Sequence, residues 1–291
     1  MAGQKTYWHL LGNKRRPSDY DIATSRLLYY PYTGFEVRHP LKAWYETYQS
    51  ESRLRCEDWE RFADPRQTTY AKYTALQRSK VEFVQALFRS IEESGHDQTL
   101  SEKWRHEQAD FLASVLFPCH GLQMAAAYVG HMAPASRIVI AAALQTADEI
   151  RRIQTLAYRL RQLQQTSPGV GATGRDVWQT HPSWQPLREL IEKLLVAYDW
   201  GEAFVALNLV VKPAFDSLFA DHWAKRARAA GDYLFAEILG SLAEDSRWQQ
   251  SWSAALVATS TQEREANTAV IAEWRERWQA PTQQALEALT A

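Results

Sequence analysis

Acidic residues are missing from a long central part of this sequence, because no aspartate or glutamate occurs between residues 111 and 147. A metal site built from carboxylates therefore cannot draw a ligand from that stretch. Cysteine is equally scarce, with only Cys56 and Cys119 in the whole chain. Their contexts match neither a metal-ligand spacing nor a disulfide framework, so we expect two reduced thiols.

Neither sign of charge is in excess. The chain has 33 lysines and arginines against 34 aspartates and glutamates, which excludes the strongly basic surface typical of nucleic-acid-binding proteins. Residues 1–13 lack the apolar segment of a secretory signal, and the longest uninterrupted apolar runs, near residues 111–118 and 203–211, are too short to span a membrane. We therefore expect a cytoplasmic protein without nucleic-acid or membrane partners.

Strand patterns are absent, whereas helix start and stop signals recur along the chain. Asp64, Pro65 and Gln67 follow the order of an N-cap, a first helical residue and a capping-box partner, so they predict a helix that ends near Glu93. Further helices are predicted over residues 102–131, 136–165, 182–198, 200–229, 232–259 and 265–289. The sequence therefore predicts an all-α protein.

The first 40 residues differ from the rest. They lack sustained periodicity and contain Pro17, Pro31 and Pro40 together with a group of tyrosines at residues 29–32. We expect an extended, mostly non-helical N-terminal arm over residues 1–40, followed by one helical domain over residues 41–291.

Aromatic residues are abundant, with 12 tryptophans and 13 tyrosines. Several lie in polar sequence, namely Trp44, Tyr45, Tyr48, Trp59, Trp178, Trp184, Trp274 and Trp278. Large rings that keep one polar edge are enriched at subunit interfaces. We predict that this group forms such an interface; the alternative is that the rings pack a large helical core.

Two segments place an acid three positions before a residue that cannot bind a metal. Glu149 precedes Arg152, and Asp245 precedes Trp248. Residues three apart share one face of a helix, so an acid and a histidine at these positions would converge on a single metal ion. Arginine and tryptophan side chains offer only donors and cannot serve as ligands.

The same two segments, residues 147–152 and 243–248, resemble the Asp-Glu-x-Arg-His segment that supplies Glu-x-x-His ligands in ferritin-like di-iron oxygenases. Longer blocks resemble the β subunit of the hydroxylase in bacterial multicomponent monooxygenases, nearest to the toluene and alkene type. These blocks are residues 17–21, 64–66 with Tyr70 and Tyr73, 123–124, 132–136, 145–148, 199–204 and 207–213. The resemblance covers about residues 8–278 and implies a ferritin-like helical bundle with an extended N-terminal arm and additional outer helices.

The resemblance also implies an assembly. In this family the hydroxylase is an (αβγ)2 complex that inserts one oxygen atom from O2 into aromatic hydrocarbons or alkenes, and the α subunit holds the di-iron centre. The β chain holds no metal or other cofactor and pairs the two protomers. The expected partners are the α and γ subunits and the second αβγ protomer. An effector protein, a Rieske ferredoxin and an NADH-dependent reductase complete the system.

A metal-free centre needs another way to accommodate its acids. We predict that Glu149, Glu202 and Asp245 are relics of the ligand set, and that Arg152 bridges Glu149 to either Asp245 or Glu202. Trp248 is expected to fill the volume of a lost histidine. No catalytic or metal-binding residue is therefore assigned. Two other interpretations stay open, an independent ferritin-like di-iron enzyme and a helical adaptor unrelated to oxygenases.

Overall fold

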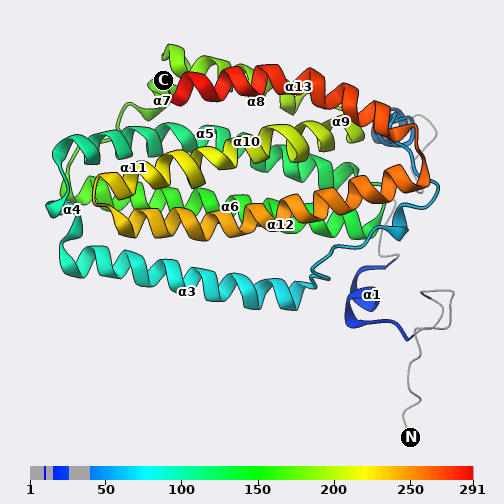
Figure 1. Cartoon of the computed structure of the whole chain (residues 1–291), viewed down its shortest axis with the longest axis horizontal. Coiled ribbons are helices and arrows are strands. Elements are labelled where there is room, and N and C mark those ends of the chain that lie inside the picture. Colours follow the sequence, from blue (N-terminus) through cyan, green and yellow to red (C-terminus); the bar gives the residue numbers. More distant parts are fainter. Residues whose placement is uncertain (1–9, 11–15, 26–39, 291) are drawn as a thin grey trace, which may run out of the picture.

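The computed structural model describes residue 10, residues 16–25 and residues 40–290, and every regular element among them is helical (Figure 1). Four long helical segments form the central layers: α5 (Glu102–Met132), α6 (Ser136–Thr166), the continuous segment Trp200–Ala229 and α12 (Tyr233–Glu263). The buried apolar side chains of these segments belong to one core. The all-α prediction is confirmed.

Two further long helices flank the core. In Figure 1, α3 (Tyr70–Ser94) runs along one side of the bundle and α13 (Asn267–Thr290) along the opposite side. The shorter α-helices are α1 (Asp19–Thr24), α2 (Pro40–Tyr45), α4 (His96–Thr99), α7 (Gly174–Thr180) and α8 (Gln185–Leu195). The 3-10 turns are η3 (Trp59–Arg61) and η4 (Pro182–Trp184), and a π-helical turn, η2 (Glu46–Ser50), follows α2.

The segment Trp200–Ala229 alternates between α- and π-helical geometry. It consists of α9 (Trp200–Phe204), η5 (Val205–Val211), α10 (Lys212–Ser217), η6 (Leu218–Trp223) and α11 (Ala224–Ala229), with η5 and η6 π-helical. Pro213 follows the first π segment, where the altered hydrogen-bond register accommodates a residue that cannot donate from its backbone nitrogen.

The predicted start of α3 is wrong. Instead of capping a helix, the Asp64 carboxylate accepts hydrogen bonds from the backbone N–H groups of Arg66 and Thr68 and closes a turn. Gln67 in that turn has a positive φ of 48°, which interrupts any helix. The helix begins only at Tyr70, capped by the preceding threonine. Its end is as predicted, because Gly95 adopts the left-handed conformation of a C-cap.

Two helices are more apolar than their short uninterrupted apolar runs predict. By length and composition, α5 and the segment Trp200–Ala229 would each suffice to cross a membrane. Most of each apolar window is buried inside the bundle, as in a core helix. Burial by neighbouring helices therefore accounts for much of their apolar composition.

The aromatic residues pack the core. Tyr45, Trp184, Trp274 and Trp278 are buried, so the prediction that they form a subunit interface is wrong. The other members of the group, Trp44, Tyr48, Trp59 and Trp178, are partly buried and pack against the same core. A large helical core explains most of the aromatic content.

The described part of the N-terminal arm, which the sequence predicts to be extended and mostly non-helical, contains one short helix. Ser18 and Asp21 form a complete capping box at the start of α1. Arg137 at the start of α6 donates to the Asp21 carboxylate at 2.7 Å and to the Ser25 hydroxyl at 2.7 Å. This buried ion pair anchors α1 to the bundle. The tyrosines at residues 29–32 lie outside the described residues.

Candidate functional site

Four charged side chains meet at the centre of the bundle. Glu149 and Arg152 project from α6, and Lys212 and Asp216 project from α10; all four are buried. The Lys212 ammonium lies 3.0 Å from Glu149 Oε1 and 2.6 Å from each carboxylate oxygen of Asp216. Arg152 Nη1 donates to Asp216 Oδ1 at 2.5 Å, and its Nε lies 3.7 Å from Glu149 Oε2. We call this set the central ion cluster.

Helix geometry explains why these four residues converge. Glu149 and Arg152 are three positions apart, and Lys212 and Asp216 four apart, so each pair shares one face of its helix. Two anionic and two cationic side chains then balance one another in the buried interior. Burial opposes ionisation of Asp216, but the charges of Arg152 and Lys212 outweigh burial and lower its pKa below the ordinary value.

A second group of charges lies beside the central ion cluster and extends to α3. Lys80 Nζ lies 2.5 Å from Asp245 Oδ1, and Arg151 donates to Asp245 Oδ2. Burial tends to raise the pKa of Asp245, but Arg151 and Lys80 together hold it below its usual range. Asp245 is therefore an ionised, doubly paired carboxylate.

Asp148 has a different environment, although it is equally buried. Its Oδ1 accepts hydrogen bonds from Tyr73 Oη at 2.8 Å and Gln77 Nε2 at 2.7 Å, and its Oδ2 accepts one from Gln249 Nε2 at 3.3 Å. All three donors are neutral. Burial first, and then the negative charge of Asp245, raise the pKa of Asp148 to about 7.

The prediction that Arg152 bridges Glu149 to a second acid is confirmed in part. Arg152 does contact Glu149, but the second acid that it binds is Asp216 rather than Asp245 or Glu202. Asp245 pairs with other cations, as described above. Glu202 lies in the first turn of α9, where its Oε1 accepts hydrogen bonds from Arg277 at 2.9 Å and Trp278 at 3.0 Å on α13. It joins two outer elements and takes no part in the central ion cluster.

The expected position of Trp248 is also wrong. Its indole nitrogen donates to Asp64 Oδ1 at 3.0 Å, and the Arg66 guanidinium lies 5.6 Å from its ring centre. The side chain therefore packs against the turn before α3. The residues of α12 that do face the central ion cluster are Ser246, whose hydroxyl accepts from Arg152 at 3.2 Å, and Gln249, which donates to Glu149 at 3.5 Å.

Sequence reasoning missed Lys212 and Asp216 because it searched for acids followed by histidine. A usable signal existed. Lys212 and Asp216, an oppositely charged pair at a spacing of four, are the only charged residues in the mostly apolar stretch from residue 203 to residue 219. Such a pair in a buried helix needs countercharges from another helix, and α6 supplies them.

The central donor set does not fit a di-iron centre. Such a centre in a helical bundle requires two Glu-x-x-His pairs and two further carboxylates. Here arginine and lysine, which cannot ligate a metal, bind the carboxylates of Glu149 and Asp216. Among the residues that the structure describes, no group of three or more His, Cys, Asp or Glu side chains is placed to hold a metal ion.

The nearby thiol offers no reactive alternative. Cys119 is fully buried, and burial is the main reason that its pKa is raised to about 12. Because the thiolate is the reactive form, this side chain is inert at neutral pH. Both Cys56 and Cys119 are free thiols, as the sequence predicted.

A separate buried network of ion pairs and hydrogen bonds surrounds Arg159 in the C-terminal part of α6. Arg159 forms a two-pronged ion pair with Asp97 at 2.6 and 2.9 Å and donates to Gln108 at 3.1 Å. Asp232, the N-cap of α12, accepts from Trp104 at 3.1 Å and from Gln108 at 3.0 Å. These contacts join α4, α5, α6 and α12, so their role is structural.

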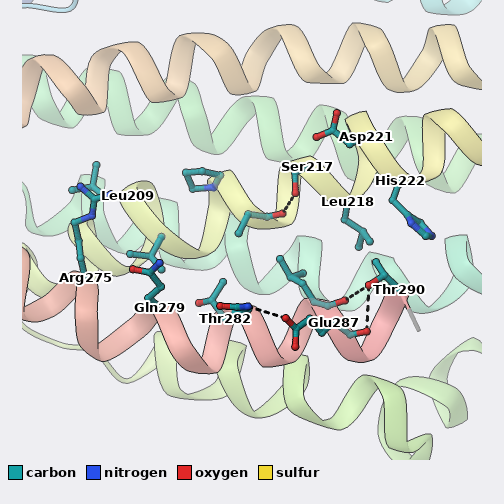
Figure 2. Close-up of a pocket in the computed structure, with 15 residues that line it drawn as sticks. Leu209, Ser217, Leu218, Asp221, His222, Arg275, Gln279, Thr282, Glu287 and Thr290 are labelled. Carbon is teal, nitrogen blue, oxygen red and sulfur yellow. Dashed lines mark hydrogen bonds between the residues drawn. The ribbon is translucent and has the colours of Figure 1, made fainter.

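A surface groove lies between the segment Trp200–Ala229 and α13 (Figure 2). Its cavity volume is about 480 Å³. Leu209 and Leu218 supply apolar lining, whereas Arg275 and Glu287 of α13 make part of its polar wall. Burial and then the charge of Arg226 lower the pKa of its single histidine, His222. No residue of the central ion cluster lines the groove, so the two are distinct features.

Comparison with known proteins identifies the family. Residues 38–264 match the family model for methane, phenol and alkene hydroxylases. The chain belongs to this family. It is 38% identical to the β subunit of the toluene-4-monooxygenase hydroxylase component of Ectopseudomonas mendocina, over 98% of this chain and 89% of that protein. The interpretation as an adaptor unrelated to oxygenases is therefore wrong.

Other relatives support the same conclusion. The chain is 33% identical to the small subunit of the propane 2-monooxygenase hydroxylase component of Mycolicibacterium goodii, over 50% of this chain and 41% of that protein. Among solved structures, toluene 4-monooxygenase with toluene in its resting active site superposes with a TM-score of 0.92, covering 98% of this chain and 95% of the matched chain. The ferritin-like fold and the hydroxylase β-subunit resemblance inferred from the sequence are confirmed.

Proposed function

We propose that this chain is a non-catalytic β subunit in the hydroxylase of a multicomponent monooxygenase, which inserts one oxygen atom from O2 into aromatic hydrocarbons or alkenes. The observation that carries the non-catalytic role is the central ion cluster. Arg152 and Lys212 form ion pairs with the carboxylates of Asp216 and Glu149. In a di-iron protein of this fold, carboxylates and histidines at the centre of the bundle bind the metal instead.

The partners follow from the same assignment. We infer that the chain binds a di-iron α subunit and a small γ subunit, and that two αβγ protomers form the hydroxylase. An effector protein, a Rieske ferredoxin and an NADH-dependent reductase would serve that complex in the cytoplasm. The 38% identity to a toluene-4-monooxygenase hydroxylase β subunit, over nearly the whole chain, supports this inference.

In this role the chain contributes rigidity rather than chemistry. The central ion cluster connects α6 to α10, and Ser246 and Gln249 extend the connection to α12. These are directional contacts between core helices, so they fix the helices in one arrangement. A rigid subunit presents a constant surface to its partners, which keeps the cost of ordering at the interface low.

A charge-neutral replacement inside the cluster tests the proposal. The double variant Glu149→Gln with Lys212→Met removes one cation and one anion together. We expect it to lower the melting temperature of the complex, while hydroxylation per assembled complex keeps the kcat and KM of the wild type. A loss of kcat in complexes that retain full subunit stoichiometry and iron would contradict the non-catalytic role.

A further inference from the structure

A second cavity, with a volume of about 340 Å³, lies between α3 and α6. On α3, its wall includes Val81, Gln85 and Arg89, which share one face of the helix because they are four positions apart. On α6, the facing wall includes Arg151 and Tyr158, two helical turns apart. Cavities that bind small molecules begin at about 300 Å³, so this one is large enough to hold a ligand.

The charge of the lining favours an anion. Among the described residues that line the cavity, the charged ones are Arg89 and Arg151, and none is acidic. Arg89 is exposed, whereas Arg151 is only 8% exposed. A hollow with apolar walls and charges of one sign concentrates ligands of the opposite sign.

Arg151 has hydrogen-bonding capacity that the protein does not use. Its Nη2 donates to Asp245 and to the Ser241 carbonyl oxygen, the latter at 3.5 Å. Its Nε and Nη1 are buried and have no hydrogen-bond partner within the part of the chain that the structure describes. Asp245 also binds Lys80, so two cations share this one carboxylate. Buried donors without an acceptor are unfavourable, and an anionic oxygen beside Arg151 would therefore be stabilised.

Aromatic side chains lie at the other end of the cavity. The ring centres of Phe88 and Tyr158 are 4.5 Å apart, with Phe88 buried and Tyr158 49% exposed. The Tyr158 hydroxyl donates to Glu92 at 3.3 Å, which holds the ring at the edge of the cavity. Arg151 and Tyr158 are separated by about 10 Å along the axis of α6, because an α-helix rises 1.5 Å per residue. A buried cation and an aromatic wall are thus one small molecule's length apart.

We propose that the cavity between α3 and α6 binds a small aromatic carboxylate, in which a short alkyl chain links the ring to the carboxylate group. The carboxylate accepts hydrogen bonds from Arg151 and from the hydroxyl of Thr155, which lines the cavity one turn further along the same face of α6. The ring packs against Phe88 and Tyr158. This binding site goes beyond the proposed non-catalytic role and does not depend on it.

Other ligand classes match the cavity less well. Phosphate sites draw on free backbone N–H groups at a helix N-terminus or on several cations close together. The lining residues lie inside α3 and α6, where the helix uses its own backbone N–H groups, and Arg151 is the single buried cation. A neutral aromatic compound would leave the free donors of Arg151 without an acceptor. A carboxylate with an aromatic ring satisfies both ends.

Titration calorimetry of the full-length chain with phenylpropanoate tests the proposal. We expect one ligand per chain with a Kd of about 1 mM or tighter, as the size of the ligand allows. Phenylpropanol, the neutral analogue, should bind at least about tenfold more weakly, because it lacks the charge-assisted hydrogen bonds. Arg151→Gln should abolish this difference between acid and alcohol. Circular dichroism of each variant checks that the helix content is native.

Tyr158→Ala tests the aromatic end without disturbing the buried ion pairs, so it remains informative if Arg151→Gln does not fold. It should weaken the binding of acid and alcohol alike, by about threefold or more. The matched control is Tyr70→Ala at the start of α3, where the tyrosine is 76% exposed and does not line the cavity. This control should bind phenylpropanoate like the wild type.

Amide hydrogen exchange locates the ligand. Phenylpropanoate should slow exchange over residues 81–89 and 151–158 more than elsewhere, and slowing confined to other segments would overturn the proposal. Equal affinity of the wild type for acid and alcohol would overturn it as well, as would acid binding that neither substitution weakens. Acetate binding as tightly as phenylpropanoate would show an adventitious ion only. No saturable binding up to about 10 mM would also refute the site.

Discussion

Arg152 and Asp216 form an ion pair across the centre of the helical bundle, with Nη1 and Oδ1 separated by 2.5 Å and both side chains buried. Lys212 and Glu149 complete the set, so each charge has an opposite neighbour. Burying charges is unfavourable unless they are paired and hydrogen-bonded. The cluster therefore holds α6 and α10 together only while it is complete.

Removing Arg152 should destabilise the fold strongly. Arg152→Ala leaves Asp216 and Glu149 sharing one buried cation, and we expect the free energy of unfolding to fall by roughly 3–5 kcal/mol. Urea denaturation of the isolated chain measures this change. Arg188→Ala is the control, because its partner Glu192 is exposed; its effect should stay below about 1 kcal/mol. A similarly small effect for Arg152→Ala would refute the buried ion pair.

Lys212 and Glu149 should depend on one another. Lys212→Met alone leaves an uncompensated acid, whereas adding Glu149→Gln removes that acid. A double-mutant cycle should therefore show a coupling energy of about 1–3 kcal/mol, with the double variant more stable than the sum of the single effects indicates. Additive effects, within about 0.5 kcal/mol, would mean that the two side chains do not interact.

Asp148 should make stability depend on pH near neutrality. Burial, and then Asp245, raise its pKa to about 7, whereas the unfolded chain releases this proton near pH 4. The stabilisation from the bound proton is complete below about pH 4 and is lost as the pH rises through about 7. Asp148→Asn does not titrate and should lack this loss.

Comparing the wild type with Asp148→Asn isolates the contribution of Asp148 to the pH dependence of stability. Between pH 4 and pH 8, we expect the free energy of unfolding of the wild type to fall by roughly 2–4 kcal/mol relative to Asp148→Asn. The lowered pKa values of Asp216 and Asp245 act in the opposite direction, with stability lost as the pH falls below their ordinary values. Both chains share that contribution. Parallel pH profiles would show that Asp148 titrates normally.

The first half of α3 should open more easily than the second. Val84, Phe88 and Ile91 are its buried residues, whereas its N-terminal turns contact the bundle through polar side chains such as Lys80. Lys80→Met should speed amide hydrogen exchange by about tenfold over residues 70–80 and leave residues 84–94 unchanged. Arg78→Met, which loses only an exposed pair, is the control. A uniform change along α3 would contradict this division.

The helix pattern was predictable where local signals decide it. Gly95 stops α3 because a left-handed C-cap favours glycine, and this preference is visible in sequence. The start of α3 was not predictable, because the Asp64 carboxylate serves a turn that also receives the Trp248 indole from a distant helix. Tertiary contacts override a local capping signal in such cases.

The same limit applies to the candidate site. The contact between Glu149 and Arg152 follows from their spacing on one helix, so the sequence predicted it correctly. The pairing of Arg152 with Asp216 depends on how α6 and α10 are rotated about their axes, which spacing within one helix does not reveal. Family resemblance indicated which positions were altered, but the structure identified their new partners.

The most direct test of the account is the iron content of this chain, expressed alone and together with its α and γ partners. We predict almost no iron in the isolated chain, and about two iron ions for each αβγ unit in the purified complex. Iron analysis is paired with subunit quantification on the same samples. About two iron ions per chain in the isolated protein would contradict the central claim, because the bundle would then hold a metal centre of its own.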